Sequence, residues 1–392
     1  MICHARDIRT GSPLQIDYGE TIEQVTPVER PVSMYVAPGW IDLQVNGSAG
    51  VDFNAPDTPL AEIARSIQFL FSTGVTRFFP TVVTNSPDHM LGCLRNLAHA
   101  RESLAEGGAM EAFHVEGPHI SPEDGPRGAH ARPWVRPPDL EEFRRWQDAA
   151  QGHIRIVTLA PEWPQAPQYI ETIVREGLVA SIGHTGANAS QIADAVSAGA
   201  TLSTHLGNGA HPVLPKLSNY LWDQLVEDRL MADFIVDGIH LTAAFLKAAI
   251  RAKGIDRSIL ITDAVAPAGC APGRYWSAGQ EVELTADQRV VLAGQQRLAG
   301  SALRMDRGVE NLMRIAGLSL ADAARMATTN PARGARVPGR MAGLAAGDRA
   351  DLILFHFDDP AQQIEIDATY LDGRCVYHRP GAVAEATNGA LK

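Results

Sequence analysis

The feature that most constrains the fold of this chain is a regular alternation of strand-like and helix-like segments between residues 38 and 267. Segments with apolar residues at helical spacing, such as residues 59–74 and 189–197, separate the strand-like ones. Eight such repeats over about 225 residues predict a (β/α)8 barrel of the TIM type. The strand-like segments lie near residues 41, 78, 112, 155, 180, 201, 233 and 259.

Both ends of the chain differ from this central region. Residues 1–37 and 345–392 contain short alternating runs that are typical of β-strands. We therefore expect these two segments to pair into one small β-sandwich domain beside a barrel domain of residues 38–344. Strand-like runs around residues 272–300 predict a β insertion within the barrel domain. The expected fold class is α/β, a TIM-type barrel with a small β-sandwich formed by the N- and C-terminal segments.

The composition of the chain limits which kinds of molecule it is expected to bind and where it is expected to work. The 392 residues carry a formal net charge of -11, which argues against nucleic acid or an anionic membrane surface as a partner. The charged N-terminus resembles no signal peptide, and no apolar stretch reaches the roughly 18 residues of a membrane span. Four scattered cysteines without a CxxC pair indicate reduced thiols. We expect a cytoplasmic protein that acts on a small molecule.

Polar side chains follow most of the predicted barrel strands. The carboxyl ends of parallel strands meet at one edge of a barrel, which is where such barrels place their active sites. Any single residue could be a capping or hydrogen-bonding group. Burying several costs roughly 1–3 kcal/mol each unless they are paired, so their convergence favours a functional site. In strand order these residues are Gln44, Asn46, Glu116, His184, His205, Asp237, His240 and Asp263.

The residue types in this set suit a catalytic metal site. His184 and His205 end adjacent strands and could share one ion. A carboxylate with two imidazoles leaves a fourth position open, and an ion there lowers the pKa of a water ligand toward about 7. Asp263 could take a proton from that water and return it to a leaving group. The pattern does not distinguish zinc from iron or manganese.

Several segments also resemble a known family, the N-acetylglucosamine-6-phosphate deacetylases of the amidohydrolase superfamily. In order from about residue 38 to 355 they are PGWIDLQVNG, HVEGPHISPEDGPRGAH, IGHTGA, THLGNGA, DGIHL, ITDAVAP, LAGSA and NPARGARV. The resemblance implies hydrolysis of the N-acetyl amide of N-acetyl-D-glucosamine 6-phosphate to glucosamine 6-phosphate and acetate. Gln44 and Asn46 stand where many amidohydrolases have His-x-His and two metals. This implies one divalent ion per subunit, Zn²⁺ first, with Fe²⁺, Mn²⁺ or Co²⁺ as alternatives.

By the same resemblance, Glu116, His184 and His205 are the metal ligands, with Gln44 and Asn46 close behind them. Asp263 is the general acid and base, and His130 polarises the acetyl carbonyl. His240 matches a histidine that reaches the substrate of a neighbouring subunit, which implies a homodimer. The residues that match substrate contacts are Ala129, His130, Asn208, Gly209, Lys216, His240, Leu298, Ala299 and Gly300.

Two departures from the family pattern concern the substrate. Residues 207–210 are Gly-Asn-Gly-Ala where the family has Phe-Asn-Ala-Met. Lys216 aligns with the phosphate-binding arginine of the family; it either holds phosphate as a point charge, without the bidentate fork of arginine, or is a solvated loop charge. An unphosphorylated or different N-acyl amino sugar is therefore an alternative substrate. A non-catalytic sugar-binding barrel is a further alternative, disfavoured by the intact set of ligands and Asp263.

Overall fold

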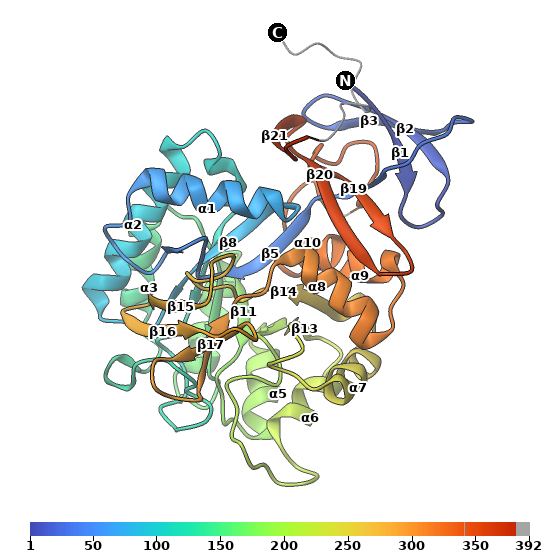
Figure 1. The fold of residues 1–392 in the computed structure, drawn as a ribbon. Helices are drawn as coiled ribbons and strands as arrows, with labels where there is room; N and C mark the ends of the chain where they lie inside the picture. Colours follow the sequence, from blue (N-terminus) through green and yellow to red (C-terminus); the bar gives the residue numbers. More distant parts are fainter. Residues whose placement is uncertain (341, 382–392) are drawn as a thin grey trace.

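Eight parallel strands form the centre of the molecule in this computed structural model, which describes residues 1–340 and 342–381 (Figure 1). The first and last strands meet through a parallel bridge between Val45 and Ala264. Beside it, the Thr262 hydroxyl donates a 2.5 Å hydrogen bond to Asp42. The predicted (β/α)8 barrel is confirmed. In sheet order the strands are β5 (Trp40–Val45), β8 (Val75–Val83), β9 (Phe113–Glu116), β10 (Ile154–Leu159), β11 (Val179–Ile182), β12 (Leu202–Ser203), β13 (Met231–Ile235) and β14 (Ser258–Ile261).

Helices surround this barrel, and polar side chains mark where several of them begin. Asn188 and Gln191 form a capping box at α5, and Asp139 accepts hydrogen bonds from two backbone amides at α3. No helix within the described ranges is both long and apolar enough to cross a membrane. The helices are α1 (Leu60–Ser72), α2 (Pro87–Ser103), α3 (Leu140–Ala149), α4 (Ala166–Arg175), α5 (Ala189–Ser197), α6 (Tyr220–Val226), α7 (Ala243–Lys253), α8 (Met305–Asn311), α9 (Leu320–Ala327) and α10 (Thr329–Gly334), with a π-helical turn at Leu312–Ala316.

The interior of the barrel changes from apolar to polar toward the carboxyl ends of its strands. A cluster that includes Ile41, Phe79 and Ile156 is fully buried. Closer to the carboxyl ends of the strands, buried hydroxyl groups pair with one another: Thr158 and Thr204 lie 2.7 Å apart, and Ser181 is 2.6 Å from Thr204. These hydrogen bonds satisfy the polar groups directly beneath the strand ends.

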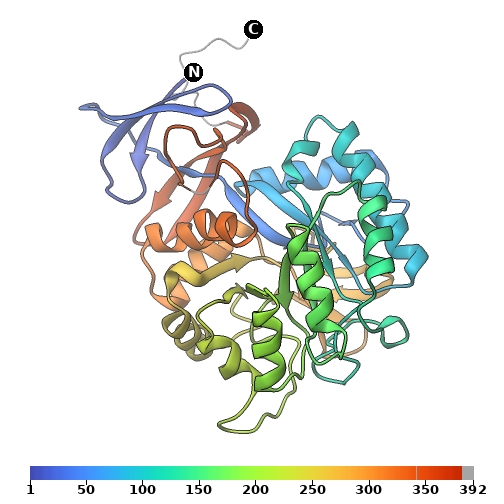
Figure 2. The same ribbon diagram turned by 180° about the vertical axis from the view of Figure 1, so that it is seen from behind.

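Strands from both ends of the chain form a seven-stranded sheet beside the barrel (Figure 2). Three strands separate β2 from β20 in this sheet, a distance of roughly 19 Å if it were flat. The rings of Tyr18 and Tyr370 are nevertheless 6.0 Å apart, so the sheet folds over its own core as the predicted sandwich. Residues 382–392, assigned to this domain from the sequence, lie outside the described residues. The strands in order are β21 (Arg374–His378), β20 (Gln363–Leu371), β19 (Leu352–Asp358), β4 (Tyr35–Pro38), β1 (Ile2–Asp7), β2 (Pro13–Tyr18) and β3 (Ile22–Pro27).

A four-stranded antiparallel sheet follows the last barrel strand. Ser301 at its end donates a 3.0 Å backbone hydrogen bond to Asp263, and Val265 donates one of 3.1 Å to Ser301. These bonds fix the sheet to the carboxyl edge of the barrel. Its strands are β15 (Gly273–Ser277), β16 (Gln280–Leu284), β17 (Arg289–Leu292) and β18 (Leu298–Ser301). A two-stranded ribbon, β6 (Gly47–Ser48) and β7 (Val51–Asp52), follows β5.

Candidate active site

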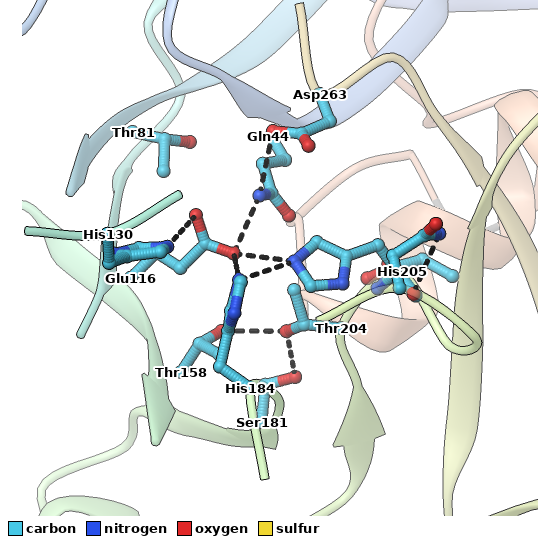
Figure 3. A network of polar contacts seen from close by, with 12 residues as sticks. Gln44, Thr81, Glu116, His130, Thr158, Ser181, His184, Thr204, His205 and Asp263 are labelled. Carbon is cyan, nitrogen blue, oxygen red and sulfur yellow. Dashed lines mark hydrogen bonds and ion pairs between the residues drawn. The ribbon is translucent and has the colours of Figure 1, made fainter. Parts of the chain in front are cut away.

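A buried carboxylate, Glu116 at the end of β9, is the centre of a compact polar cluster (Figure 3). The Nε2 atom of His205 lies 2.8 Å from its Oε1 atom, and that of His184 lies 3.3 Å from the same oxygen. The two Nε2 atoms are 3.0 Å apart. Three ligand-type atoms from the ends of three strands therefore converge on one small volume.

The backbone at the strand ends has an unusual conformation. His184, His205 and Asp263 each lie two residues beyond a strand, with φ angles of 51°, 31° and 50°. Left-handed φ values are uncommon for residues other than glycine, cost free energy, and cluster at functional sites. The barrel therefore keeps this strain at the three positions where the sequence predicted reactive side chains.

The His184 ring is held so that one nitrogen faces the cluster. Its Nδ1 atom donates to the carbonyl of Pro126 at 2.8 Å, which leaves the Nε2 lone pair directed at Glu116 and His205. A Cβ added at Gly209 would lie 2.6 Å from Nδ1, and one at Gly128 would lie 3.0 Å from Cε1. The two glycines thus allow the backbone to pack directly against the imidazole.

The electrostatics of the cluster suit a cation. Burial favours the neutral form of Glu116, but the neighbouring His184 and His205 imidazoles hold the pKa of this carboxyl well below its usual range. Burial lowers the pKa of His205, yet the hydrogen bond and charge of Glu116 outweigh it and raise that pKa to about 9. An ionised carboxylate beside two imidazoles fits a divalent metal ion, which would take the place of the proton between His205 and Glu116.

His130 joins this group from the loop that follows β9. Its Nε2 atom is 3.8 Å from Oε2 of Glu116, and its Nδ1 atom is 2.7 Å from the hydroxyl of Thr84. The ligand atoms of Glu116, His130 and His184 all lie within 4.8 Å of one another, so His130 could also approach an ion. Burial, and then the neighbouring His184, lower the pKa of His130 to about 3, which keeps the ring neutral.

Asp263 lies on the other side of Glu116. The Gln44 amide donates to both carboxylates, at 2.9 Å to Glu116 and 3.0 Å to Asp263 (Figure 3). Asn46 donates to Asp263 at 2.8 Å. Burial raises the pKa of Asp263 to about 6, and the charge of Glu116 adds to the increase. This carboxyl group can therefore gain and lose a proton near neutral pH.

A cavity of about 550 Å³ opens above these groups. It brings together most of the residues that the sequence singled out; Gln44 lies behind the lining and Lys216 does not reach it. The predicted residues that line the cavity are Asn46, Glu116, Ala129, His130, His184, His205, Asn208, Gly209, His240, Asp263, Leu298, Ala299 and Gly300.

At the substrate end of the site, two of the residues expected to contact substrate are Lys216 and His240. Lys216 is exposed on the segment between β12 and α6, and its side chain does not line the cavity of its own chain. His240, expected to reach the substrate of a neighbouring subunit, lines the cavity of its own chain, and its role toward a second subunit stays a prediction. Asp237 holds its ring there, with Oδ2 2.6 Å from Nδ1.

Arg297 is a lining residue that the sequence reasoning missed. It directly precedes Leu298, Ala299 and Gly300, which were expected to cover the pocket. The available signal was a cation adjacent to that loop. Thr84, which fixes the orientation of His130, was missed as well, because nothing in the sequence relates the end of β8 to the loop after β9.

Comparisons with known proteins agree with this geometry. The family model described as "Amidohydrolase family" matches residues 35–376. N-acetylglucosamine-6-phosphate deacetylase from Bacillus subtilis (strain 168) is 33% identical over 334 residues, which cover 84% of this chain and 83% of that protein. N-acetylgalactosamine-6-phosphate deacetylase from Escherichia coli O157:H7 is 31% identical over 345 residues, 87% of this chain and 89% of that protein.

A solved structure extends the similarity to the fold. A mutant of N-acetyl-D-glucosamine-6-phosphate deacetylase from Mycobacterium smegmatis, in complex with N-acetyl-D-glucosamine-6-phosphate, superposes with a TM-score of 0.86. The two chains are 30% identical, and the match covers 96% of this chain and 99% of that one. The chain therefore belongs to the amidohydrolase family of metal-dependent hydrolases, in the group of the N-acetylglucosamine-6-phosphate deacetylases.

Proposed function

We propose that this enzyme hydrolyses the N-acetyl amide of N-acetyl-D-glucosamine 6-phosphate, giving glucosamine 6-phosphate and acetate. The observation that carries the proposal is the convergence of Glu116, His184, His205 and Asp263 in one cavity. The similarity to deacetylases of phosphorylated amino sugars supports this chemistry. It also favours this substrate over the unphosphorylated alternative.

In this proposal Glu116, His184 and His205 hold one divalent ion, with Zn²⁺ the first candidate and Fe²⁺, Mn²⁺ and Co²⁺ also compatible. Such an ion acts as a Lewis acid and makes water more acidic. The Gln44 amide supports a single ion, because its N–H group already occupies the space between Glu116 and Asp263. His130 is left free for the substrate, since it lies farther from Glu116 than either proposed imidazole ligand.

Asp263 moves the proton. It accepts a proton from the attacking water as the oxygen bonds to the acetyl carbon, and it donates this proton to the amide nitrogen as the C–N bond breaks. Gln44 and Asn46 hold its carboxylate in place. Neutral His130 accepts from Thr84 at Nδ1 and donates from Nε2 to the acetyl oxygen, which stabilises the developing negative charge.

The remaining residues of the cavity surround the sugar. We assign Ala129, Asn208, Gly209, His240 and the segment 298–300 to substrate contacts, which their position in the lining supports. The M. smegmatis complex contains the gluco epimer, whereas the E. coli relative is named for the galacto epimer. Both names include a 6-phosphate, which supports a phosphorylated substrate for this chain.

A substrate screen tests the proposal. Enzyme reconstituted with Zn²⁺ is assayed for acetate release on N-acetylglucosamine 6-phosphate, N-acetylgalactosamine 6-phosphate and N-acetylglucosamine. We expect kcat/KM to be highest for N-acetylglucosamine 6-phosphate and activity to vanish after chelation. A preference for the free sugar would refute the phosphorylated substrate, and the absence of acetate release from all three would refute the deacetylase function.

We further propose a homodimer that works in the cytoplasm. Four large apolar side chains are exposed within one short segment, at Val213 (84%), Leu217 (84%), Trp222 (48%) and Val226 (71%). Exposed apolar patches of this kind are typical of protein interfaces. The cytoplasmic location is supported by four free cysteines, Cys3, Cys93, Cys270 and Cys375.

A further inference from the structure

Three loops at the carboxyl end of the barrel meet around the ring of His211. Its Nε2 atom is 3.1 Å from Oε2 of Glu123 in the loop after β9, and its Nδ1 atom is 3.0 Å from the hydroxyl of Tyr220. The same hydroxyl accepts a 2.8 Å hydrogen bond from the backbone amide of His211. A Cβ added at Gly186, in the loop after β11, would lie 3.3 Å from Cε1 of His211. Each of these loops follows a strand that leads to a proposed metal ligand.

The backbone of His211 also packs against the loop after β9. A Cβ added at Gly125 would lie 3.0 Å from Cα of His211, so the two loops are in contact close to Glu123. Pro126 directly follows Gly125, and its carbonyl accepts the 2.8 Å hydrogen bond from Nδ1 of His184. His211 is therefore linked to a metal ligand through one short stretch of loop.

The orientation of His184 depends on both of these loops. The loop after β9 supplies the Pro126 carbonyl and Gly128, and the loop after β12 supplies Gly209. If the loops separated, the imidazole would lose the acceptor at Nδ1 that directs its Nε2 atom toward Glu116. Loss of an outer partner of a metal-bound histidine typically weakens metal binding about 10- to 100-fold.

Tyr220 connects this contact to the exposed apolar segment of residues 213–226. It begins α6 and is only 6% exposed, whereas the apolar side chains of Val213 and Leu217 face solvent. Its two contacts with His211 close residues 211–220 into a loop. The base of the exposed segment is thus fixed within its own chain, whatever covers its apolar side chains.

We propose that His211 is a positioning residue, which joins the loops after β9 and β12 and thereby keeps His184 oriented to bind the metal ion. The inference rests on the proposed function, which includes that ion. In the described part of the chain, His211, Glu123 and Tyr220 all lie outside the cavity lining. Their effect on the reaction therefore passes through the metal site rather than through contact with the substrate.

Zinc binding, measured apart from turnover, tests this inference. The Kd for Zn²⁺ is determined by competition with a chromophoric chelator. We expect it to rise about 10-fold in His211→Phe, and less in Glu123→Ala and Tyr220→Phe, which each remove one contact. The double variant His211→Phe/Glu123→Ala should match His211→Phe, because both changes break the same contact. Acetate release should fall at limiting Zn²⁺ and recover when Zn²⁺ is in excess, since site occupancy follows mass action.

Two control variants separate this effect from others. His356→Phe is the matched control, because His356 is a half-exposed histidine that pairs with Asp367 at 2.9 Å on the small sheet. Trp222→Glu changes an exposed residue of α6 and controls for the state of the proposed interface. Each should change the Kd for Zn²⁺ less than about twofold, as expected for a site independent of the metal ligands.

Unchanged Zn²⁺ affinity in His211→Phe and Tyr220→Phe would overturn the inference, as would an equal loss in Trp222→Glu. Thermal unfolding of the metal-free proteins is the second measurement, and we expect His211→Phe to unfold within about 3 °C of wild type. A larger decrease, shared by Tyr220→Phe, would show a general loss of fold and overturn the inference; if His211→Phe does not fold, Tyr220→Phe decides.

The fate of the proposed function is separable from that of this inference. Wild-type enzyme that binds one Zn²⁺ but releases no acetate refutes the proposed deacetylase function. In that case a raised Kd for Zn²⁺ in His211→Phe would still support the positioning role. Wild-type protein that binds no Zn²⁺ would overturn the inference.

Discussion

Two carboxylates that share the Gln44 amide as a hydrogen-bond donor have opposite protonation behaviour. The pKa of Glu116 is lowered by the two imidazoles beside it, whereas burial and the charge of Glu116 raise the pKa of Asp263. Pairs of acidic groups whose environments separate their pKa values are a reliable guide to acid and base roles. The difference supports Glu116 as the metal ligand and Asp263 as the proton carrier.

This assignment predicts the direction of the pH dependence. Asp263 must be ionised to accept a proton, and its pKa is raised to about 6. A bound cation stabilises the carboxylate and lowers this pKa, so the acid limb of the profile should lie at or below about pH 6. On the acid side of that pKa, kcat/KM should decrease tenfold for each pH unit. A pH–rate profile with N-acetylglucosamine is the cleaner measurement, because a phosphate monoester titrates near pH 6 itself. Activity that rises from pH 7 to pH 5 would contradict the role of Asp263.

Single residues show how far the sequence could define the site. Glu116, His184, His205 and Asp263 were predictable because parallel strands bring their carboxyl ends to one edge. The places of Lys216 and Arg297 were not predictable, because both lie in irregular segments whose path depends on tertiary packing. In the sequence, Gly209 is a departure from the family pattern with no evident reason. The structure shows that it packs against the His184 ring.

At the scale of elements, the alternation of strand-like and helix-like segments predicted the barrel strands well. The elements inside irregular segments were predicted poorly. All eight barrel strands lie where the sequence predicts them, since buried strands are continuous apolar runs. Helix α6 was not predicted. It spans only Tyr220–Val226, depends on Asn219 as its cap, and follows a segment rich in proline. Helix α10, which has six residues, was also missed.

The barrel and the small sheet are joined by a buried ion network. Arg77 of β8 donates to Asp351 at 2.7 and 3.0 Å, and Arg340 donates to the same carboxylate at 2.6 Å. Asp351 directly precedes β19 of the small sheet. Burial alone would raise the pKa of Asp351, but Arg340 and Arg77 lower it to about 2.

Removal of this carboxylate should destabilise the whole fold. We expect Asp351→Asn to lower the free energy of unfolding by about 3–5 kcal/mol, because it leaves Arg340 buried without a counter-ion. Since the folded pKa lies below the unfolded value, the contribution of Asp351 is present above about pH 4 and is lost as pH falls toward 2. Denaturant unfolding at pH 7 and pH 3 measures both effects.

The control variant is Glu365→Gln, which removes an exposed partner of Arg379 and should cost less than about 1 kcal/mol of unfolding free energy. Equal effects of the two variants would contradict this account.

At the scale of the whole molecule, the exposed apolar segment of residues 213–226 predicts self-association. Trp222→Glu places a charge among Val213, Leu217 and Val226, so it should convert a dimer into a monomer. Sedimentation velocity at micromolar concentration is the measurement. Wild-type protein that sediments as a monomer would contradict the proposed dimer. Ile2→Glu, at another exposed apolar side chain on the small sheet, is a matched control that should leave the oligomeric state unchanged.

We propose that three side chains, Glu116, His184 and His205, hold one ion while Asp263 carries the proton. Metal content and turnover measured together on Asp263→Asn and His184→Asn test it most directly. We predict that Asp263→Asn retains about one ion per chain while kcat falls by about 100- to 10,000-fold, and that His184→Asn loses both the ion and the activity. Loss of the ion in Asp263→Asn, or full metal content in His184→Asn, would contradict the assigned roles.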